Sequence, residues 1–272
     1  MFDLKNKVAF VAGAGSVGEG WGNGRATAVL LARQGAHVFG TDVSSEALQG
    51  TTTAMTNEGL ANWQPHRCDM TDSAQVRSAV EACLQRHGRI DILVNNVGGS
   101  APGDPVAMAE EVWDAQMDLN LKTAFLACKH ILPVMEQQHA TDGGNAAIVN
   151  VSSIAHMSHQ VGGRVNVAYS TAKAGLVAFS RSTAIAYVKK GVRVNTVVVG
   201  VMDTPLVSER LVKQLGLADA EQLIAKRHAS IPMGFMGTAW DVAHAVLYLV
   251  SDEARYVTAT QLVVDGGVTA AR

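Results

Sequence analysis

Short apolar runs alternate with helix-length segments along this chain, and that alternation limits the folds it can adopt. The runs are rich in β-branched residues and bounded by Gly, Asp or Asn, as buried strands are. They cover residues 8–12, 37–41, 92–94, 147–151, 192–198 and 262–264. Helical segments are predicted between them over residues 25–34, 72–86, 120–137 and 169–189. Strand and helix in repeated alternation predict the α/β class, a doubly wound parallel sheet with helices on both faces.

The chain has 272 residues, of which 48% are hydrophobic and 17% charged, so it can bury a large core. Neither a low-complexity linker nor a repeat divides it, and we expect one domain over residues 1–272. Residues 204–237 interrupt the alternation with helix-like pieces and a run that contains Pro and Gly. An excursion of this length before the last strand is typical of a lid or substrate loop.

The composition argues against several classes of protein. A net charge of -2 offers no basic excess for nucleic acid. No apolar stretch approaches the ~20 residues of a membrane helix, and the first residues do not resemble a signal peptide. The three cysteines show no CxxC pairing, which favours free thiols in a reducing compartment. We therefore expect a cytoplasmic protein that acts on a small molecule, without nucleic acid or membrane.

Six glycines lie between Gly13 and Gly24, directly after the first predicted strand. Glycines let the backbone approach a ligand closely, and the helix that follows offers free N–H groups to a pyrophosphate. A GxGxxG pattern alone, here at residues 13–18, is a weak signal, since a flexible surface turn can also contain it. Its place between a strand and a helix favours phosphate binding.

Asp42 follows the second predicted strand. A carboxylate there can accept hydrogen bonds from the ribose hydroxyls of NAD and would repel the 2′-phosphate of NADP. The alternative is a helix cap for the segment that starts at Ser44. We favour NAD on the position of Asp42.

Tyr169 and Lys173 are spaced i and i+4, on one face of a predicted helix. Carbonyl reduction needs a proton donor at oxygen, and a free Tyr has a pKa of about 10. A nearby ammonium stabilises the phenolate and lowers that pKa. Ser153 follows the strand at residues 147–151, where it could bind the reacting oxygen. The spacing alone is weak, because a packed Tyr and a solvated Lys would look the same.

In this order the motifs resemble the short-chain dehydrogenase/reductase family over essentially the whole chain. The resemblance implies a Rossmann fold with seven strands, hydride transfer and a homotetramer. It implies the catalytic residues Asn120, Ser153, Tyr169 and Lys173, with substrate contacts from Ser153, His156 and Tyr169. The predicted cofactor-binding residues are Gly13, Ser16, Gly22, Asn23, Gly24, Asp42, Asp69, Met70, Asn96, Gly98, Tyr169, Lys173, Gly200, Val201 and Thr204.

The sequence departs from the family pattern at several places. The cofactor turn has about five extra residues, including Trp21, and Val199 stands where the family has Pro. The segment between Ser153 and Tyr169 is long and contains His156 and His159. These histidines have no evident third ligand for a metal, so we expect no metal site and interpret them as pocket lining or surface.

The sequence thus predicts an NAD(H)-dependent oxidoreductase that interconverts a secondary alcohol and a ketone, with Tyr169 as general acid and base. One alternative is an NADP(H)-dependent ketone or 3-oxoacyl reductase. Another is a non-catalytic protein that senses NAD, although such a sensor has no need of the proton relay. The substrate itself is not predicted, because loops near residues 100–105, 155–167 and 204–237 would shape its pocket.

Overall fold

A computed structural model describes residues 2–157, 165–205, 207 and 217–271 of the chain. Its elements along the chain are β1 Val8–Ala12, α1 Asn23–Arg33, β2 His37–Asp42, α2 Ser45–Asn57, β3 Trp63–Arg67, α3 Ser73–His87, β4 Ile92–Asn95, α4 Glu110–Met117, α5 Thr123–Asp142, β5 Ala146–Ser153, α6 Val167–Tyr187, β6 Val192–Val199, β7 Met202–Asp203, α8 Leu217–Ala229, β8 Gly237–Thr238, α9 Ala239–Val250 and β9 Gln261–Val264.

Seven of the strands form one parallel sheet in the order β3-β2-β1-β4-β5-β6-β9. This confirms the predicted Rossmann-type α/β fold. The strand order reverses its direction of winding between β1 and β4, and the crevice at such a switch point is where ligands bind in open parallel sheets. A separate pair, β7 and β8, lies beyond the carboxyl end of β6.

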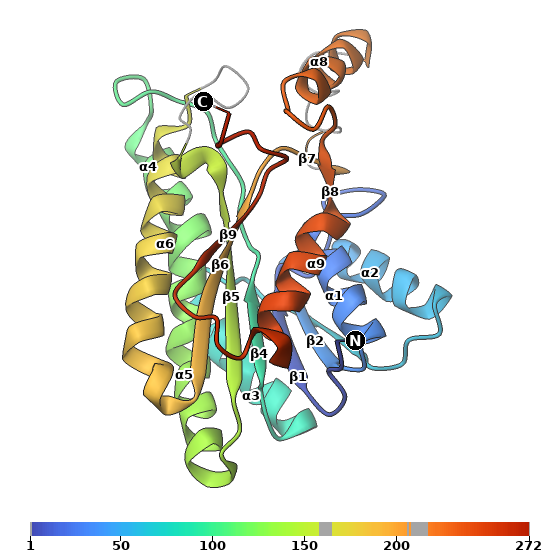
Figure 1. Ribbon diagram of the computed structural model, residues 1–272, viewed down its shortest axis with the longest axis vertical. Coiled ribbons are helices and arrows are strands. Elements are labelled where there is room, and N and C mark those ends of the chain that lie inside the picture. Colours follow the sequence, from blue (N-terminus) through green and yellow to red (C-terminus); the bar gives the residue numbers. More distant parts are fainter. Residues whose placement is uncertain (1, 158–164, 206, 208–216, 272) are drawn as a thin grey trace.

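Helices cover both faces of the sheet (Figure 1). Alternate residues of β1 explain how one strand serves two cores: Ala9 and Val11 pack with α1 and α9, whereas Phe10 packs with α3 and α5 on the opposite face. Because both faces are buried, the central strands are apolar throughout rather than alternating. No helix in the described ranges is long and apolar enough to cross a membrane.

The edge strand β3 is the one strand of the seven-stranded sheet that the sequence pattern did not predict. Its five residues, from Trp63 to Arg67, are half-buried or exposed, and Pro65 lies in the middle. An edge strand needs only one buried face and tolerates proline, so it shows neither an apolar run nor clear alternation. Parallel pairing with β2, rather than a pattern in its own sequence, therefore defines β3 as a strand.

The predicted helix at residues 120–137 also differs in the structure. Asp118–Lys122 forms a π-helical turn, and α5 begins only after it, at Thr123. A π-helical turn inserts an extra residue into the helical ladder and occurs often at functional sites. Hydrophobic periodicity does not reveal such an insertion.

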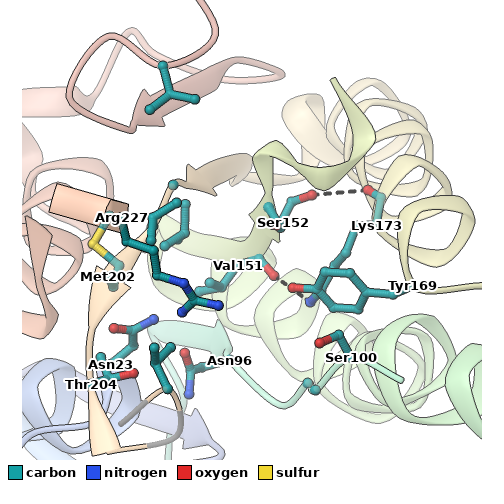
Figure 2. Close-up of a pocket in the computed structure, with 18 of the residues that line it drawn as sticks. Asn23, Asn96, Ser100, Val151, Ser152, Tyr169, Lys173, Met202, Thr204 and Arg227 are labelled. Carbon is teal, nitrogen blue, oxygen red and sulfur yellow. Dashed lines mark hydrogen bonds between the residues drawn. The ribbon is translucent and has the colours of Figure 1, made fainter. Parts of the chain in front are cut away.

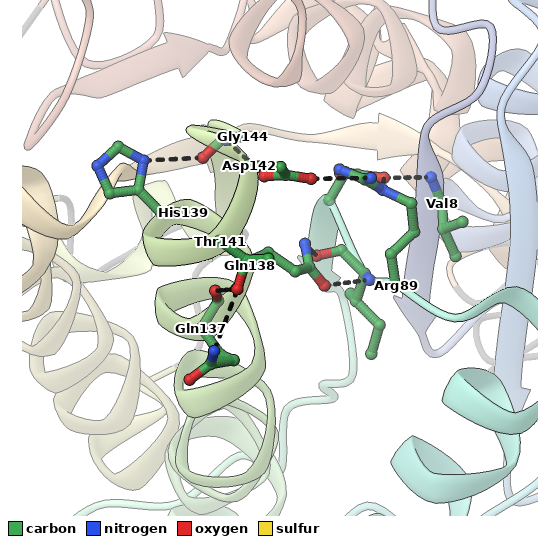
Figure 3. A network of polar contacts seen from close by, with 10 residues as sticks. Val8, Arg89, Gln137, Gln138, His139, Thr141, Asp142 and Gly144 are labelled. Atoms are coloured by element: carbon green, nitrogen blue, oxygen red, sulfur yellow. Dashed lines mark hydrogen bonds and ion pairs between the residues drawn. The ribbon is translucent and has the colours of Figure 1, made fainter.

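A polar network at the amino-terminal edge of the sheet joins three segments (Figure 3). Asp91, which is buried, accepts hydrogen bonds from the backbone N–H of Val8 at 2.8 Å and from Arg89 at 2.6 Å. Gln138 on α5 exchanges two hydrogen bonds with the backbone of Ile90. The network therefore fixes the start of β1 and the entry to β4 against α5.

Replacing Arg89 should destabilise the fold, because the carboxylate of Asp91 would stay buried without its counter-charge. We expect Arg89→Ala to lower the free energy of unfolding by about 3 kcal/mol, measured by urea denaturation. Arg77→Ala is the matched control, since the Arg77–Glu81 pair is exposed and 3.9 Å long and should contribute little. Equal stability of the two variants would contradict this role of Asp91.

Candidate active site

Two adjoining cavities open at the carboxyl ends of the central strands. The larger, of about 1100 Å³, lies over the glycine-rich turn, and the smaller, of about 310 Å³, lies over Ser153 and α6. Asn23, Asn96, Gly98 and Thr204 line both cavities. The position at the switch point is that of a ligand site in folds of this kind.

The glycine-rich turn is held close to the first turn of α1. Gly13 has a φ of +77°, and its carbonyl accepts a hydrogen bond from the side chain of Asn96 at 2.9 Å. A Cβ at Gly24 would collide with that carbonyl, and one at Gly22 would lie 3.1 Å from Ser16 Oγ. Packing therefore requires glycine at residue 24, and the left-handed backbone conformation favours it at residue 13.

The polar groups of this turn fit an anionic ligand. Gly22 caps α1 without a side-chain hydrogen bond, so the first N–H groups of the helix face the larger cavity. Ser16 Oγ and Asn23 Oδ1 are buried, and neither has a hydrogen-bond partner in the described part of the chain. Groups of this kind need a partner from outside the protein: the Ser16 hydroxyl can donate to a phosphate oxygen, whereas Asn23 Oδ1 accepts and needs a donor such as a ribose hydroxyl of a dinucleotide.

Asp42 lies at the end of β2 and lines the larger cavity. Its carboxylate accepts hydrogen bonds from the N–H groups of Gly15 at 3.1 Å and Ser44 at 3.0 Å. The N-cap of α2 is Ser44, whose hydroxyl accepts from the N–H of Ala47. Asp42 is thus not the cap of this helix, and its carboxylate is fixed where it borders the cavity.

Asp69 and Met70 follow β3 and line the same cavity. Asp69 accepts two hydrogen bonds from Thr71, through its N–H at 2.9 Å and its hydroxyl at 2.7 Å. Met70 is buried, and its sulfur accepts from the hydroxyl of Thr41. Both side chains are held in place by neighbours, so the wall they form is preorganised.

The extra residues of the cofactor turn pack onto α9. The ring of Trp21 lies 4.6 Å from the ring of Trp240, and the guanidinium of Arg33 lies 4.5 Å from the latter ring. Arg33 also forms a bidentate ion pair with Glu58, at 2.6 and 2.7 Å. The enlarged turn is therefore anchored by a tilted contact between two aromatic rings, away from Gly13 and Gly24.

Ser153, Tyr169 and Lys173 line the smaller cavity. Figure 2 shows Tyr169 and Lys173 side by side there. Ser153 ends β5, whereas Tyr169 and Lys173 come from successive turns of α6. The hydroxyl of Ser153 is hydrogen-bonded to Tyr169, and Lys173 Nζ donates to the carbonyl of Val151 at 2.9 Å. The ammonium lies 5.8 Å from the centre of the tyrosine ring. The sequence placed these three side chains together correctly.

Burial changes the protonation of both groups. It raises the pKa of Tyr169 above its ordinary value, and the hydrogen bond with Ser153 offsets this only in part. It lowers the pKa of Lys173, whose side chain is 3% exposed, to about 8. We expected a lowered pKa for Tyr169. The protein environment alone does the opposite, because desolvation of the phenolate outweighs its stabilising contacts.

Asn120 lies in the π-helical turn and is 1% exposed. Its amide donates to the carbonyls of Gly99 and Gln116 and accepts from the N–H of Gly99, each at 3.0 Å. A Cβ at Gly98 would lie 2.8 Å from Asn120 Oδ1 and 3.0 Å from Lys173 Nζ. Asn120 therefore fixes the strand-to-helix loop that passes beside Lys173.

The other predicted residues divide between the cavity and its surroundings. Gly200, Val201 and Thr204 line the smaller cavity. Val199, at the position where the family has Pro, extends β6 and pairs with Val264 of β9. His156 lines neither cavity: its ring nitrogens lie 2.6 Å from the carbonyl of Ser153 and 3.1 Å from Gln261 Oε1. His159 lies outside the described residues.

Sequence reasoning did not select several residues that line the smaller cavity. Arg227 and Ser230 belong to the end of α8 and the turn after it, and Val268 follows β9. The sequence predicted a substrate loop over residues 204–237 without selecting Arg227 or Ser230, and only the tertiary structure brings them and Val268 to the cavity that Tyr169 also lines. Among the residues that the structure describes, no group of three His, Cys, Asp or Glu side chains could hold a metal ion.

A nucleotide cradle beside a Ser–Tyr–Lys cluster, on a parallel sheet, defines a class of nucleotide-dependent α/β oxidoreductases. Comparison with known proteins gives the family. Residues 18–269 match the family model described as enoyl-(acyl carrier protein) reductase. The chain is 35% identical to 3-oxoacyl-(acyl-carrier-protein) reductase FabG of Thermotoga maritima, over 97% of this chain and 98% of that protein. This chain belongs to the short-chain dehydrogenase/reductase family.

Solved structures agree. A short-chain dehydrogenase/reductase from Burkholderia xenovorans is 47% identical with a TM-score of 0.92, and each chain is covered to 99%. The structure of levodione reductase is 30% identical with a TM-score of 0.89, covering 99% of this chain and 100% of that one. The curated levodione reductase of Leifsonia aquatica is 33% identical over 98% of this chain and 95% of its own.

The close approach of Gly98 to Asn120 and Lys173 can be tested. We expect Gly98→Ala to lower nicotinamide-dependent turnover by on the order of 10²-fold, because the new methyl group displaces both side chains. Gly99→Ala is the matched control, since its Cβ would meet only Leu119 at 3.7 Å. Turnover by Gly98→Ala equal to that of the control would contradict the inferred packing.

Proposed function

We propose that this protein is an NAD(H)-dependent oxidoreductase that interconverts a secondary alcohol and a ketone, with Tyr169 as general acid and base. One observation carries the proposal: the hydroxyl of Tyr169 is hydrogen-bonded to Ser153, beside a buried Lys173, in a cavity that adjoins the nucleotide cradle. A proton donor, an orienting hydroxyl and a cation are the groups that carbonyl reduction requires.

The bound nicotinamide would supply the hydride acceptor or donor. The N–H groups at the start of α1, with the Ser16 hydroxyl, would hold the diphosphate, and Asn23 Oδ1 would accept from a ribose hydroxyl. Asp42 and Asp69 would face the adenosine half. The remaining predicted cofactor contacts, Met70, Asn96, Gly98, Gly200, Val201 and Thr204, line the two cavities between these ends.

The chain's own residues would handle the proton. In oxidation, the Tyr169 phenolate takes the proton of the substrate hydroxyl, and the Ser153 hydroxyl donates to the same oxygen as it becomes a carbonyl. Lys173, held against Val151, favours the phenolate by its charge, and Asn120 keeps the loop at Gly98 beside Lys173. Serine and tyrosine both hydrogen-bond the reacting oxygen, so the substrate carbon is oriented toward the cofactor.

Two further features complete the proposal. Residues 204–237 would form the wall on the substrate side, with Thr204, Val207 and Arg227 on the smaller cavity. Of this range, residues 206 and 208–216 lie outside the described part of the chain.

Phe125 on α5 and Ile185 on α6 are 46% and 71% exposed. Exposed apolar side chains of this kind support self-association, which we propose gives a homotetramer. The relative named as a 3-oxoacyl reductase makes reduction of an oxoacyl group the second candidate.

Tyr169→Phe should lower turnover by about 10²- to 10⁴-fold, because the proton acceptor is lost. Nucleotide affinity, followed by fluorescence of NADH, should stay near that of the wild type. Tyr187→Phe, at the other end of α6 beside Lys190, is the matched control and should retain activity. Near-normal turnover by Tyr169→Phe with nucleotide bound would contradict the assignment.

The same pair should govern the pH dependence. Oxidation needs the phenolate, whose pKa is raised by burial, so kcat/KM should rise with pH. The pKa of about 8 applies to Lys173 beside a neutral tyrosine, and a phenolate beside it favours the charged lysine in turn, so the two groups titrate as a pair. Lys173→Met should therefore move the rising limb of the profile to higher pH, and an unmoved limb would argue against electrostatic coupling.

Asp42 should set the preference for NAD. Asp42→Asn removes the charge but keeps the shape of the side chain, so it should relieve repulsion of the 2′-phosphate and raise the affinity for NADPH relative to NADH by about 10-fold. Calorimetry with both nucleotides gives the ratio, and thermal unfolding shows whether the contacts to Gly15 and Ser44 survive. Tighter binding of NADPH than NADH by the unmodified protein would contradict the proposal.

A further inference from the structure

Arg227 is a cation that the proposed proton transfer does not use. It lies in the last turn of α8 and lines the smaller cavity together with Ser153, Tyr169 and Lys173. Figure 2 shows its guanidinium directed into that cavity, on the side opposite α6. Its side chain is half-buried. A guanidinium that faces a substrate cavity is suited to bind a carboxylate through two parallel hydrogen bonds.

The charges of the two cavities differ in sign. Of the described residues that line the smaller cavity, the charged ones are Lys173 and Arg227, and no carboxylate is among them. The larger cavity is lined by four carboxylates, those of Glu19, Asp42, Glu46 and Asp69, and by one arginine, Arg25. Two cations at low dielectric favour a negative group in the smaller cavity.

The end of α8 is held firmly enough to position Arg227. The carbonyl of Arg227 accepts hydrogen bonds from the hydroxyl and the N–H of Ser230, at 2.8 and 3.2 Å. His228 accepts from the N–H of Met236 at 3.0 Å. Ile224, one turn earlier, packs against the buried cluster that contains Met236 and Ile231. The guanidinium therefore extends from a helix end that is tied to the sheet.

We propose that Arg227 binds a carboxylate of the substrate, so that the enzyme acts on hydroxy acids and the corresponding oxo acids. This rests on the proposed function. In oxidation the alcohol carbon gives its hydride to the nicotinamide, the hydroxyl proton passes to Tyr169, and the carboxylate remains unchanged against Arg227. The apolar side chains of Met202, Val207 and Val268 would contact the carbon chain.

The nucleotide diphosphate is the other anion that could meet Arg227. The residues that fit the diphosphate, Ser16 and the first turn of α1, line the larger cavity, to which Arg227 does not contribute. Arg227 instead shares its cavity with the reacting side chains. The substrate is therefore the anion that the geometry favours.

The test compares substrates that differ only in charge. 3-Hydroxybutyrate and 2-hydroxybutyrate are each assayed beside their methyl esters with NAD+, and binding of each compound in the presence of NADH is measured by calorimetry. The wild type should prefer at least one acid over its ester. Arg227→Ala should lower kcat/KM for that acid by about 10- to 100-fold and leave the ester nearly unchanged. Arg227→Lys should restore part of the loss.

Lys226→Ala is the matched control, because Lys226 precedes Arg227 on the same helix but is exposed and lines neither cavity. It removes the same charge and should keep the preference for the acid. Loss of the preference in this control would overturn the assignment to Arg227 in favour of the general field of the helix.

Three other results would overturn the proposal: equal binding of acid and ester by the wild type, no binding of either acid, or weaker NADH binding by Arg227→Ala with an unchanged preference for the acid. The last would assign Arg227 to the diphosphate. Failure of the proposed function looks different. Acid binding that depends on Arg227, without any turnover, would contradict the reaction and support the carboxylate site.

Discussion

The parallel direction of the seven strands is the constraint on which the rest of the structure depends. Because every strand of the main sheet points the same way, the ends of β1, β4, β5 and β6 lie along one edge. The glycine turn, the loop at Gly98, Ser153 and Gly200 follow those four strands. The winding reverses between β1 and β4, so this edge opens into the crevice that contains both cavities.

Burial changes the pKa values of the two titratable groups in the candidate site. Lys173 is almost fully buried, and its ammonium donates a hydrogen bond to the carbonyl of Val151. Burial lowers the pKa of this lysine to about 8 and raises that of Tyr169, so neither charge is favoured by the protein alone. The pKa of Lys173 thus moves toward neutral pH, whereas that of Tyr169 moves away from it.

Much of the fold and of the candidate site could be predicted from the sequence, because these features depend on patterns between residues that are close along the chain. Six of the seven main strands were visible as buried apolar runs, and Tyr169 and Lys173 lay on one helical face by spacing alone. The strand β3 was missed because an edge strand with Pro65 carries no apolar pattern. The π-helical turn at Asn120 was missed because one inserted residue does not alter the periodicity enough to be seen. His156 was expected in the pocket, but its bonds to Ser153 and Gln261 hold it beside the cavity.

The sequence by itself determined the strand–helix alternation, the glycine-rich turn and the order of the predicted site residues, since each depends on neighbours along the chain. Only the tertiary structure decided what surrounds them. The ring of Trp21 packs against that of Trp240, and Arg227 lines the cavity of Tyr169, although these segments lie far apart in the chain. The buried environment of Tyr169 likewise depends on packing, which no spacing can report. Tyr169 was thus identifiable from the sequence, whereas its pKa and the charge opposite it were not.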